Sequence, residues 1–220
     1  MNKLKHMAVV ACLSLWAAAS HATVIPCDAT AGNLVQNCGF ESGDFSSWAL
    51  SGADVPGDLN NLYGVEFGTD PDGNDPHGGS YQAWFGDFVA NPLTLAQTLA
   101  TKAGDQYLVS FYLAQDGSPP DKGYSAPHLQ TSFGGTSLNN VTAVPMQAYT
   151  EYAFLVYATS ASSLLSLTLG NDTGYFLLDD VSVVDQTPGV AVPEPNSLAL
   201  VGVGLLAFFT MRSRRRGRQR

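Results

Sequence analysis

Short stretches of alternating apolar and polar residues, separated by turns rich in glycine and proline, fill the middle of the chain. The clearest is 106–115, whose apolar face consists of Tyr107, Val109, Phe111 and Leu113. The other predicted strands are 80–85, 93–99, 150–159, 163–169 and 175–184. No sustained helical period lies between them. Many short strands joined by tight turns predict an all-β domain over residues 23–186, built as a sandwich of two antiparallel sheets.

Charge is distributed unevenly along the chain, whose formal net charge is −9. Residues 23–194 hold all 19 acidic side chains and only two basic ones, Lys102 and Lys122, so this stretch has a formal charge of −17. A domain this acidic repels phosphate backbones. We therefore expect no nucleic acid among its partners.

The first 22 residues have the three parts of a secretory signal peptide in the usual order. Lys3 and Lys5 form the basic start, 7–19 the apolar stretch, and Ser20-His21-Ala22 a small-x-small cleavage site. The alternative is a buried N-terminal helix. The order of the three parts predicts export through the Sec translocon and cleavage by signal peptidase.

Cleavage at that site changes the cysteine count. Cys12 leaves with the signal peptide, while Cys27 and Cys38 remain. Outside the cytosol, an even pair of cysteines favours a disulfide over two buried free thiols.

A linker at 187–191 separates the predicted domain from a distinctive C-terminal tail, 192–220. The tail begins Val192-Pro193-Glu194-Pro195 and continues with an apolar stretch at about 197–211. As a transmembrane helix this stretch is short, because its fourteen most apolar residues reach ~21 Å and a hydrocarbon core is ~30 Å thick. The arginines that follow predict a cytoplasmic end; they are Arg212, Arg214, Arg215 and Arg216.

A Pro-Glu-Pro triplet, a short apolar helix and a terminal arginine cluster resemble the PEP-CTERM sorting domain of Gram-negative bacteria. The resemblance implies an exosortase, a membrane protease that cuts near Pro-Glu-Pro, and a bacterium that makes exopolysaccharide. It predicts an intermediate anchored in the inner membrane and then a protein at the cell surface or in the extracellular matrix. The alternative is an ordinary single-pass anchor.

Two motifs bracket the predicted domain. It opens with Asn-Leu-Val-Gln-Asn-Cys-Gly-Phe-Glu at 33–41, followed by Gly-Asp-Phe at 43–45 and by Trp48. It closes with Tyr-Phe-Leu-Leu-Asp-Asp-Val-Ser-Val at 175–183. Both resemble galactose-binding-like jelly rolls, which include carbohydrate-binding modules of the CBM 4/9 type. The resemblance implies a jelly-roll β-sandwich; Cys38 departs from it, because a glycine is more usual there.

Asp179 is the most informative carboxylate of the chain. Strand alternation predicts that it shares the core-facing side with Leu177, Val181 and Val183. A buried charge costs several kcal/mol unless it is paired. The resemblance implies that Glu41 and Asp179 meet at a structural calcium, with Asp180 replacing Asp179 if the register shifts by one residue. The alternative is a hydrogen-bonded Asp179 without metal.

A second acidic stretch, 70–75, superficially suggests a calcium loop. The twelfth position, where a bidentate glutamate is expected, is Tyr81. We predict a solvated loop there.

Exposed aromatic rings beside polar groups are candidates for sugar binding. Trp84 shares a strand face with Gln82 and is expected to point outward, while Tyr63 and Tyr124 are expected in loops. Aromatic side chains of strands more often belong to the core, as we expect for Trp48.

Enzyme chemistry has little support in the sequence. His77 and His128 have no spacing typical of a metal pair, and there is no Gly-x-Ser-x-Gly turn. We predict a non-catalytic exported protein that binds carbohydrate of the exopolysaccharide or matrix. The alternatives are a structural biofilm protein without a sugar pocket, or a weak glycoside hydrolase.

Overall fold

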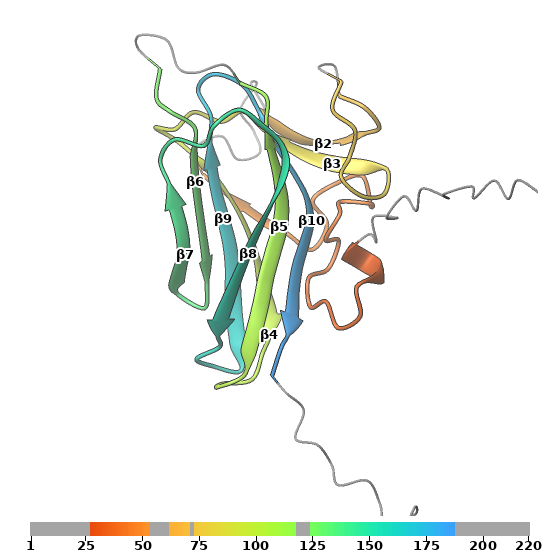
Figure 1. Ribbon diagram of the computed structural model, residues 1–220, viewed down its shortest axis with the longest axis vertical. Helices are drawn as coiled ribbons and strands as arrows, with labels where there is room; N and C mark the ends of the chain where they lie inside the picture. The colour runs from red at the N-terminus through yellow and green to blue at the C-terminus, as the bar shows by residue number, and fades with distance from the viewer. Residues whose placement is uncertain (1–26, 53–61, 71–72, 118–123, 188–220) are drawn as a thin grey trace, which may run out of the picture.

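A computed structural model describes residues 27–52, 62–70, 73–117 and 124–187 of the chain (Figure 1). The predicted signal peptide, the Pro-Glu-Pro motif, the apolar tail segment and the tail arginines lie outside these ranges. None of the helices in the described ranges has the length and apolar character needed to cross a membrane.

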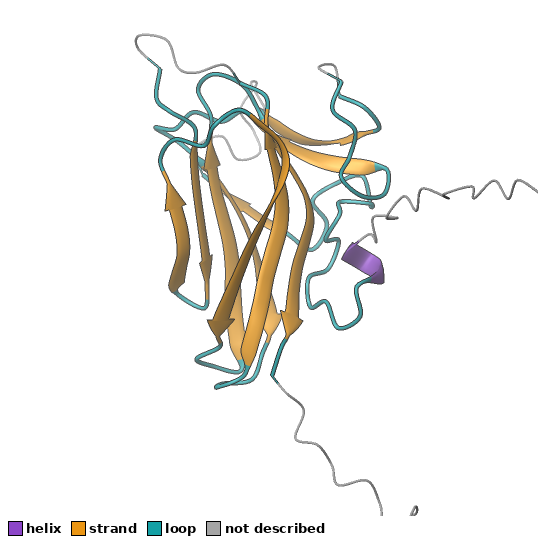
Figure 2. Ribbon diagram, viewed as in Figure 1, coloured by secondary structure: helices purple, strands orange, loops and turns teal. Residues whose placement is uncertain are grey.

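Within these ranges the chain forms two antiparallel sheets of five strands each, with one short 3₁₀ helix, η1 (Cys27–Ala29), beside them (Figure 2). The first sheet has the order β1 (Ala49–Ser51), β4 (Leu93–Ala100), β9 (Ser162–Gly170), β6 (His128–Phe133) and β7 (Thr136–Val141). The second has the order β2 (Tyr63–Phe67), β3 (Tyr81–Phe85), β10 (Phe176–Asp185), β5 (Gln106–Gln115) and β8 (Gln147–Tyr157). The predicted all-β class with two antiparallel sheets is confirmed.

The core lies between the sheets, because successive side chains of a strand point to opposite faces. On β5, the four side chains of the predicted apolar face are all buried. On β9, Leu165, Leu167 and Leu169 face them from the first sheet and are fully buried. On β8, Tyr152 and Phe154 pack against this core, whereas Leu155 and Tyr157 are exposed.

A β-bulge in β10 corrects the predicted alternation around Asp179. The register of β10 on β5 shifts between Asp179 and Ser182, and Asp180 has a positive φ of 49°. Leu178 and Val181 therefore both face the core, while Asp179 lies on the other side of the sheet with Leu177. Asp179 is nevertheless fully buried, because loops cover this outer face of the second sheet.

The N-terminal segment lies along β10 and supplies part of that cover (Figure 1). Leu34 donates its backbone N–H to Val183 O at 2.9 Å, and the side chain of Asn33 accepts the N–H of Val183 at 2.9 Å. A disulfide between Cys27 and Cys38 closes the segment on itself.

Candidate functional site

Three carboxylates, Glu41, Asp179 and Asp180, converge on the turn that precedes β3; we call them the carboxylate cluster. Asp179 Oδ2 accepts the backbone N–H of Gly78 at 2.9 Å. Glu41 Oε1 accepts the N–H groups of Ser80 at 2.8 Å and Tyr81 at 3.0 Å. Backbone donors of one turn therefore hold side chains that are more than 130 positions apart in the sequence.

Asp180 anchors the cluster to the N-terminal segment. Its Oδ1 accepts the backbone N–H of Cys27 at 2.9 Å, and its Oδ2 lies 2.7 Å from Nδ1 of His77. The His77 ring in turn stacks on Tyr112 of β5, with ring centroids 3.5 Å apart. The left-handed backbone at Asp180 turns this carboxylate toward His77 and η1.

Burial raises the pKa of Asp179 to about 8, and the negative charges of Asp180 and Glu41 act in the same direction. Hydrogen bonds from the N–H groups of Gly78 and Asp180 oppose this shift without reversing it. In the part of the chain that the structure describes, the one lysine is Lys102, which pairs with Asp105 in the turn between β4 and β5. Asp179 at neutral pH therefore keeps a proton unless a cation compensates its charge.

Glycines pack closely around the carboxylate cluster. A Cβ atom on Gly78 would lie 2.5 Å from Asp180 Oδ2, one on Gly79 would overlap Glu41 Oε1, and one on Gly39 would lie 3.4 Å from Asp179 Oδ1. Calcium prefers such a set of carboxylate oxygens, completed by carbonyls or water. The oxygens of Glu41, Asp179 and Asp180 are of the type that calcium prefers, but among the described residues they do not form a group whose ligand atoms all lie within 4.8 Å of one another. Both oxygens of Asp179 already accept backbone N–H groups, and Asp180 already pairs with Cys27 N–H and with His77.

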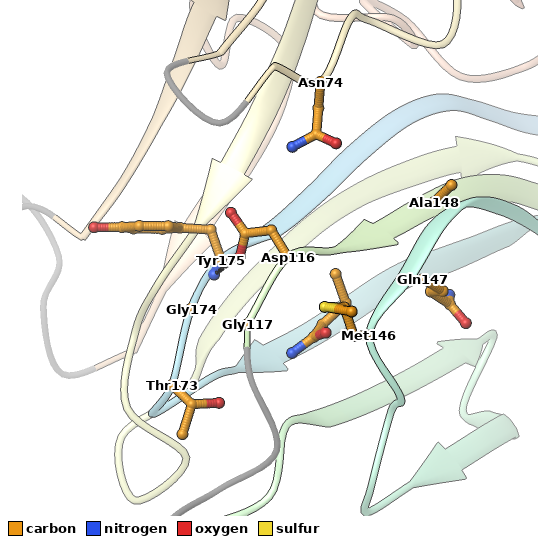
Figure 3. A pocket seen from close by; sticks show the side chains of 10 residues that line it. Asn74, Asp116, Gly117, Met146, Gln147, Ala148, Thr173, Gly174 and Tyr175 are labelled. Carbon is orange, nitrogen blue, oxygen red and sulfur yellow. Dashed lines mark hydrogen bonds between the residues drawn. The ribbon is translucent and has the colours of Figure 1, made fainter.

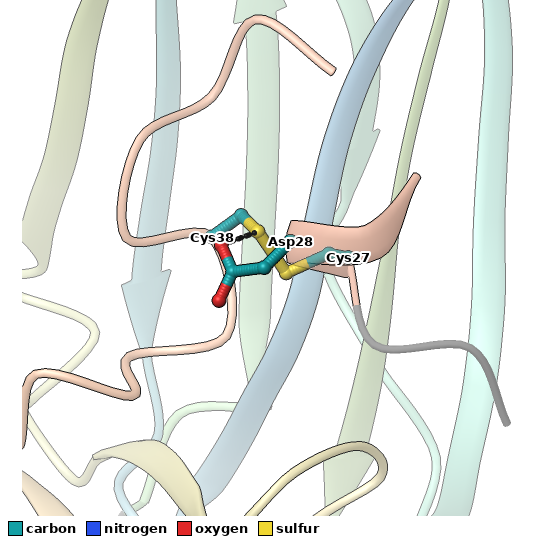
Figure 4. A group of neighbouring side chains, drawn as sticks. All are labelled: Cys27, Asp28 and Cys38. Atoms are coloured by element: carbon teal, nitrogen blue, oxygen red, sulfur yellow. Dashed lines mark hydrogen bonds between the residues drawn. A yellow bond between two sulfur atoms is a disulfide. The ribbon is translucent and has the colours of Figure 1, made fainter. Parts of the chain in front are cut away.

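Cys27, Asp28 and Cys38 form a different group of metal-type side chains, all within 4.8 Å of one another (Figure 4). Asp28 Oδ1 lies 3.0 Å from Cys38 Sγ. Because the two sulfur atoms are bonded to each other, they are not thiolate ligands. This group therefore stabilises the N-terminal segment and offers no metal site in its oxidised form.

A pocket of about 450 Å³ opens at the end of the second sheet; we call it the loop-end pocket (Figure 3). The end of β5, the start of β8, the turn between β9 and β10, and Asn74 all contribute to it. Figure 3 shows Asn74, Asp116 and Met146 around one opening, with the Tyr175 ring extending to one side. The lining residues are Asn74, Gln115, Asp116, Gly117, Met146, Gln147, Ala148, Thr173, Gly174 and Tyr175.

Two aromatic rings meet beside this pocket. Trp84 of β3 and Tyr175 lie edge to face, with centroids 5.6 Å apart, and Tyr175 is 39% exposed. Glycines make room for both rings, since a Cβ on Gly64 would lie 2.7 Å from the Trp84 indole and one on Gly86 would lie 2.5 Å from the Tyr175 ring. The pocket thus combines flat apolar surface with amide, hydroxyl and carboxylate groups, as ligand sites do.

The predicted sugar-binding residues do not form one group. Tyr63 belongs to β2 rather than to a loop, and its ring is buried against Phe45 in the core. Its predicted ligand role is therefore wrong, because a sugar cannot reach the ring. Tyr124 is exposed, and it does not line the loop-end pocket.

Gln82 and Trp84 share the outer face of the second sheet, as the alternation predicts. Gln82 is fully buried there, and its amide donates to Glu66 Oε1 at 3.0 Å while its oxygen accepts the Tyr149 hydroxyl at 2.8 Å. Gln82 therefore supports neighbouring side chains, and Trp84 is the predicted residue that lies next to the pocket.

No sequence pattern marks Asn74, Gln115, Asp116 or Tyr175 as ligand residues. Asn74 lies in the stretch 70–75, predicted as a solvated loop, Asp116 follows the predicted strand 106–115, and Tyr175 begins the predicted last strand. Residues of turns that follow different strands have no spacing that reveals a common pocket. The one available signal was an aromatic residue directly after a turn, at Gly174-Tyr175.

The C-terminal residues 191–216 match the family described as the PEP-CTERM protein-sorting motif, which confirms the predicted motif. A search of curated proteins finds no match to this chain.

Among solved structures, TmCBM61 in complex with β-1,4-galactotriose is similar, with 20% identity and a TM-score of 0.50 over 70% of this chain and 99% of that one. A CBM4 structure matches with 16% identity and a TM-score of 0.41, over 69% of this chain and 99% of that one. The CBM22-1 xylan-binding domain from Paenibacillus barcinonensis Xyn10C matches with 15% identity and a TM-score of 0.41, over 69% of this chain and 93% of that one.

At these identities, the likeness to solved structures concerns the fold alone. The chain accordingly joins a β-sandwich with the fold of carbohydrate-binding modules to a PEP-CTERM protein-sorting motif.

Proposed function

We propose that this protein is exported and binds carbohydrate at the loop-end pocket without transforming it. The observation that carries the proposal is the pocket itself, whose lining includes Asn74, Asp116 and Thr173 together with Tyr175. The Tyr175 ring meets the ring of Trp84 edge to face. A sugar ring presents an apolar face of C–H groups and an edge of hydroxyls, which match these two kinds of surface. The fold shared with a galactotriose-binding module supports the same function.

The sorting motif supports a location outside the cell. We infer that an exosortase cuts near Pro193-Glu194-Pro195, after Sec export and anchoring of the tail in the inner membrane. The released domain then reaches the cell surface or matrix. Because PEP-CTERM proteins occur in bacteria that make exopolysaccharide, that polymer is the proposed ligand.

Calcium at the carboxylate cluster is part of the proposal. Glu41, Asp179 and Asp180 would have to move closer together to hold the ion, which would compensate the charge of Asp179, a side chain that no described lysine reaches. Its role would be structural, because the cluster joins the N-terminal segment, the turn before β3 and β10. The loop-end pocket lies elsewhere, and none of the three carboxylates lines it.

Replacement of Tyr175 tests the site. Tyr175→Ala removes the exposed ring but keeps the backbone N–H that binds Asp116, so we expect glycan affinity to fall about tenfold with little change in stability. Affinities are measured on a glycan array and by calorimetry. Tyr157→Ala replaces a tyrosine on β8 that is more exposed, at 63%, and lies outside the pocket; it is the control and should bind normally.

The alternatives give different results in the same assays. A matrix protein without a pocket would bind no glycan and would self-associate or coat cells. A weak hydrolase would release product from glycosides. Equal binding by Tyr175→Ala and the wild type would move the site away from this pocket.

A further inference from the structure

The backbone of Tyr175 is fixed at the loop-end pocket. Its N–H donates to Asp116 Oδ1 at 2.6 Å, and its carbonyl oxygen accepts the N–H of Asp116 at 3.2 Å. Gly174, directly before it, lies so close to Gly117 that an added Cβ would overlap Gly117 Cα. The backbone therefore sets where the side chain begins, while rotation about χ1 and χ2 still decides where the ring points.

Two neighbours restrict that rotation. The Trp84 indole meets the Tyr175 ring at an angle of 83°, with centroids 5.6 Å apart. Gly86 packs against the same ring: a Cβ there would lie 2.5 Å from Tyr175 Cε1, whereas the nearest atom outside the ring, Leu62 O, would be 3.5 Å away. The ring thus occupies the space that a side chain at position 86 would need.

Trp84 is itself held by its cross-strand partner. Gly64 of β2 pairs with Trp84 of β3, and the three atoms nearest to a Cβ on Gly64 all belong to the indole, the first at 2.7 Å. Neither Gly64 nor Gly86 has a positive φ, so the backbone at both positions suits any residue. Space for the two rings, and not backbone conformation, therefore requires glycine there.

We propose that Trp84, Gly64 and Gly86 are positioning residues of the glycan site, which fix the orientation of the Tyr175 ring before a ligand arrives. This inference rests on the proposed carbohydrate binding and goes beyond it, because Trp84 does not line the pocket and acts through Tyr175. A ring that is already fixed loses no further rotational freedom when a sugar packs on it. From the cost of immobilising one side chain, a mobile Tyr175 ring would weaken binding about two- to tenfold.

A double-mutant cycle with Trp84→Leu and Tyr175→Ala tests this role. Calorimetry on the purified protein uses three neutral probes, β-1,4-galactotriose, xylotetraose and cellotetraose. We expect Trp84→Leu to weaken the tightest of them about two- to tenfold in the wild type and to have no further effect in Tyr175→Ala, because Trp84 acts through the Tyr175 ring. Trp84→Phe keeps an aromatic edge beside Tyr175 and should retain most of the affinity.

The glycines and the free protein give independent readouts. Gly86→Ala displaces only the Tyr175 ring, and Gly64→Ala displaces the indole behind it, so each should weaken the same probe about two- to tenfold. NMR should show nuclear Overhauser contacts between the Trp84 and Tyr175 ring protons without any glycan. Gly86→Ala should lose these contacts while the protein still unfolds cooperatively.

Phe67→Leu is the matched control. It removes a similar edge-to-face pair on the same two strands, Phe67 with Tyr81, whose centroids are 5.2 Å apart and which lies outside the pocket. Its affinity for the probe should equal that of the wild type. An equal loss in Phe67→Leu and Trp84→Leu would show a general loosening of these strands and overturn the proposal.

The remaining contrary outcomes have distinct meanings. Additive losses in the double variant would make Trp84 a direct ligand contact and overturn the positioning role. Unchanged affinity in both Trp84→Leu and Gly86→Ala, or ring contacts that form only after glycan is added, would overturn it as well and leave carbohydrate binding in place. If the folded wild type binds none of the three probes, the proposed function fails and this inference fails with it.

Discussion

Asp179 is a carboxylate that the fold removes from water, and no lysine or arginine among the described residues pairs with it. Its hydrogen bonds come from backbone N–H groups, and its charged neighbours, Asp180 and Glu41, are both negative. Desolvation and repulsion together favour the protonated form. The protonation state of Asp179 should therefore affect both the stability of the fold and any binding of a cation nearby.

This coupling predicts how stability depends on pH. The pKa of Asp179 is about 8 in the folded protein and close to its ordinary value of 3.8 in the unfolded chain. Because the folded state binds the extra proton, the free energy of unfolding in chelator should decrease as pH rises from about 4 to about 8. The slope is up to about 1.4 kcal/mol per pH unit, and urea melts at several pH values measure it.

Calcium should remove most of that loss at pH 8 and have little effect at pH 5, where the proton already occupies Asp179. Asp179→Asn, which cannot ionise, should lose both the pH slope and the calcium response. Glu151→Gln should keep both. If calcium and chelator give the same unfolding curve at pH 8, the proposed calcium site is wrong.

At the scale of elements, the turn before β3 organises the carboxylate cluster. Gly78, Ser80 and Tyr81 each donate a backbone N–H to a carboxylate from another element. Gly79 has a φ of 66° and leaves room for Glu41. The cluster thus depends on the backbone path of this turn as much as on its acidic side chains.

Two glycine-to-alanine substitutions separate the cost of a positive φ from the loss of the hydrogen bonds to Glu41. Gly104, in the turn between β4 and β5, has a φ of 90°, and a Cβ there would meet no atom within 4 Å. Gly104→Ala therefore measures the free-energy cost of the positive φ alone, about 1–2 kcal/mol. Gly79→Ala has a similar φ, but its Cβ displaces Glu41 from two N–H donors. We expect a further loss of about 1–3 kcal/mol and weaker calcium binding, measured by denaturant melts and calorimetry. Equal destabilisation of the two variants would contradict this role for Gly79.

The strands that the sequence predicts are those with strong alternation. Residues 106–115 are β5, and 93–99, 163–169 and 80–85 match β4, β9 and β3 to within one residue at each end. The missed strands, β1, β2, β6 and β7, are at most six residues long. β1, β6 and β7 carry few large apolar side chains, whereas β2 alternates Tyr63, Val65 and Phe67 with Gly64 and Glu66 and was missed although it has this pattern. Their pairing in the sheets, more than their own sequence, makes them strands.

Part of the candidate site could be predicted from the sequence and part could not. Glu41 and Asp179 follow from two local motifs, and the structure places both at one turn, although the bulge at Asp180 and the position of Asp179 on the outer face could not be predicted. The loop-end pocket could not be foreseen, because its lining comes from the ends of strands that are distant in the sequence. Tyr63 was misassigned because the short strand β2 was not recognised.

At the scale of the whole molecule, an acidic domain is joined to a basic tail. Residues 23–194 have a formal charge of −17, whereas six arginines lie between 212 and 220. Positive charge next to an apolar stretch retains that end in the cytoplasm, and the acidic domain has no such signal. The charge distribution and the sorting motif therefore favour the same orientation, with the β-sandwich outside.

Processing of the tail gives the last prediction. We expect protein isolated from the cell surface to lack the signal peptide and the arginines, since the proposed exosortase cut near the Pro-Glu-Pro triplet would remove the tail. Intact-mass spectrometry measures both ends.

Glu194→Ala should preserve the full tail and trap the protein in the inner membrane, whereas Pro188→Ala, outside the matched residues 191–216, should be processed normally. If the short apolar stretch spans the membrane as a helix, as its sequence predicts, it reaches only ~21 Å in a ~30 Å core. Uncut protein should then also be extracted more easily by mild detergent than a full-length span. Surface protein that retains Arg212 to Arg220 would instead establish an ordinary single-pass anchor.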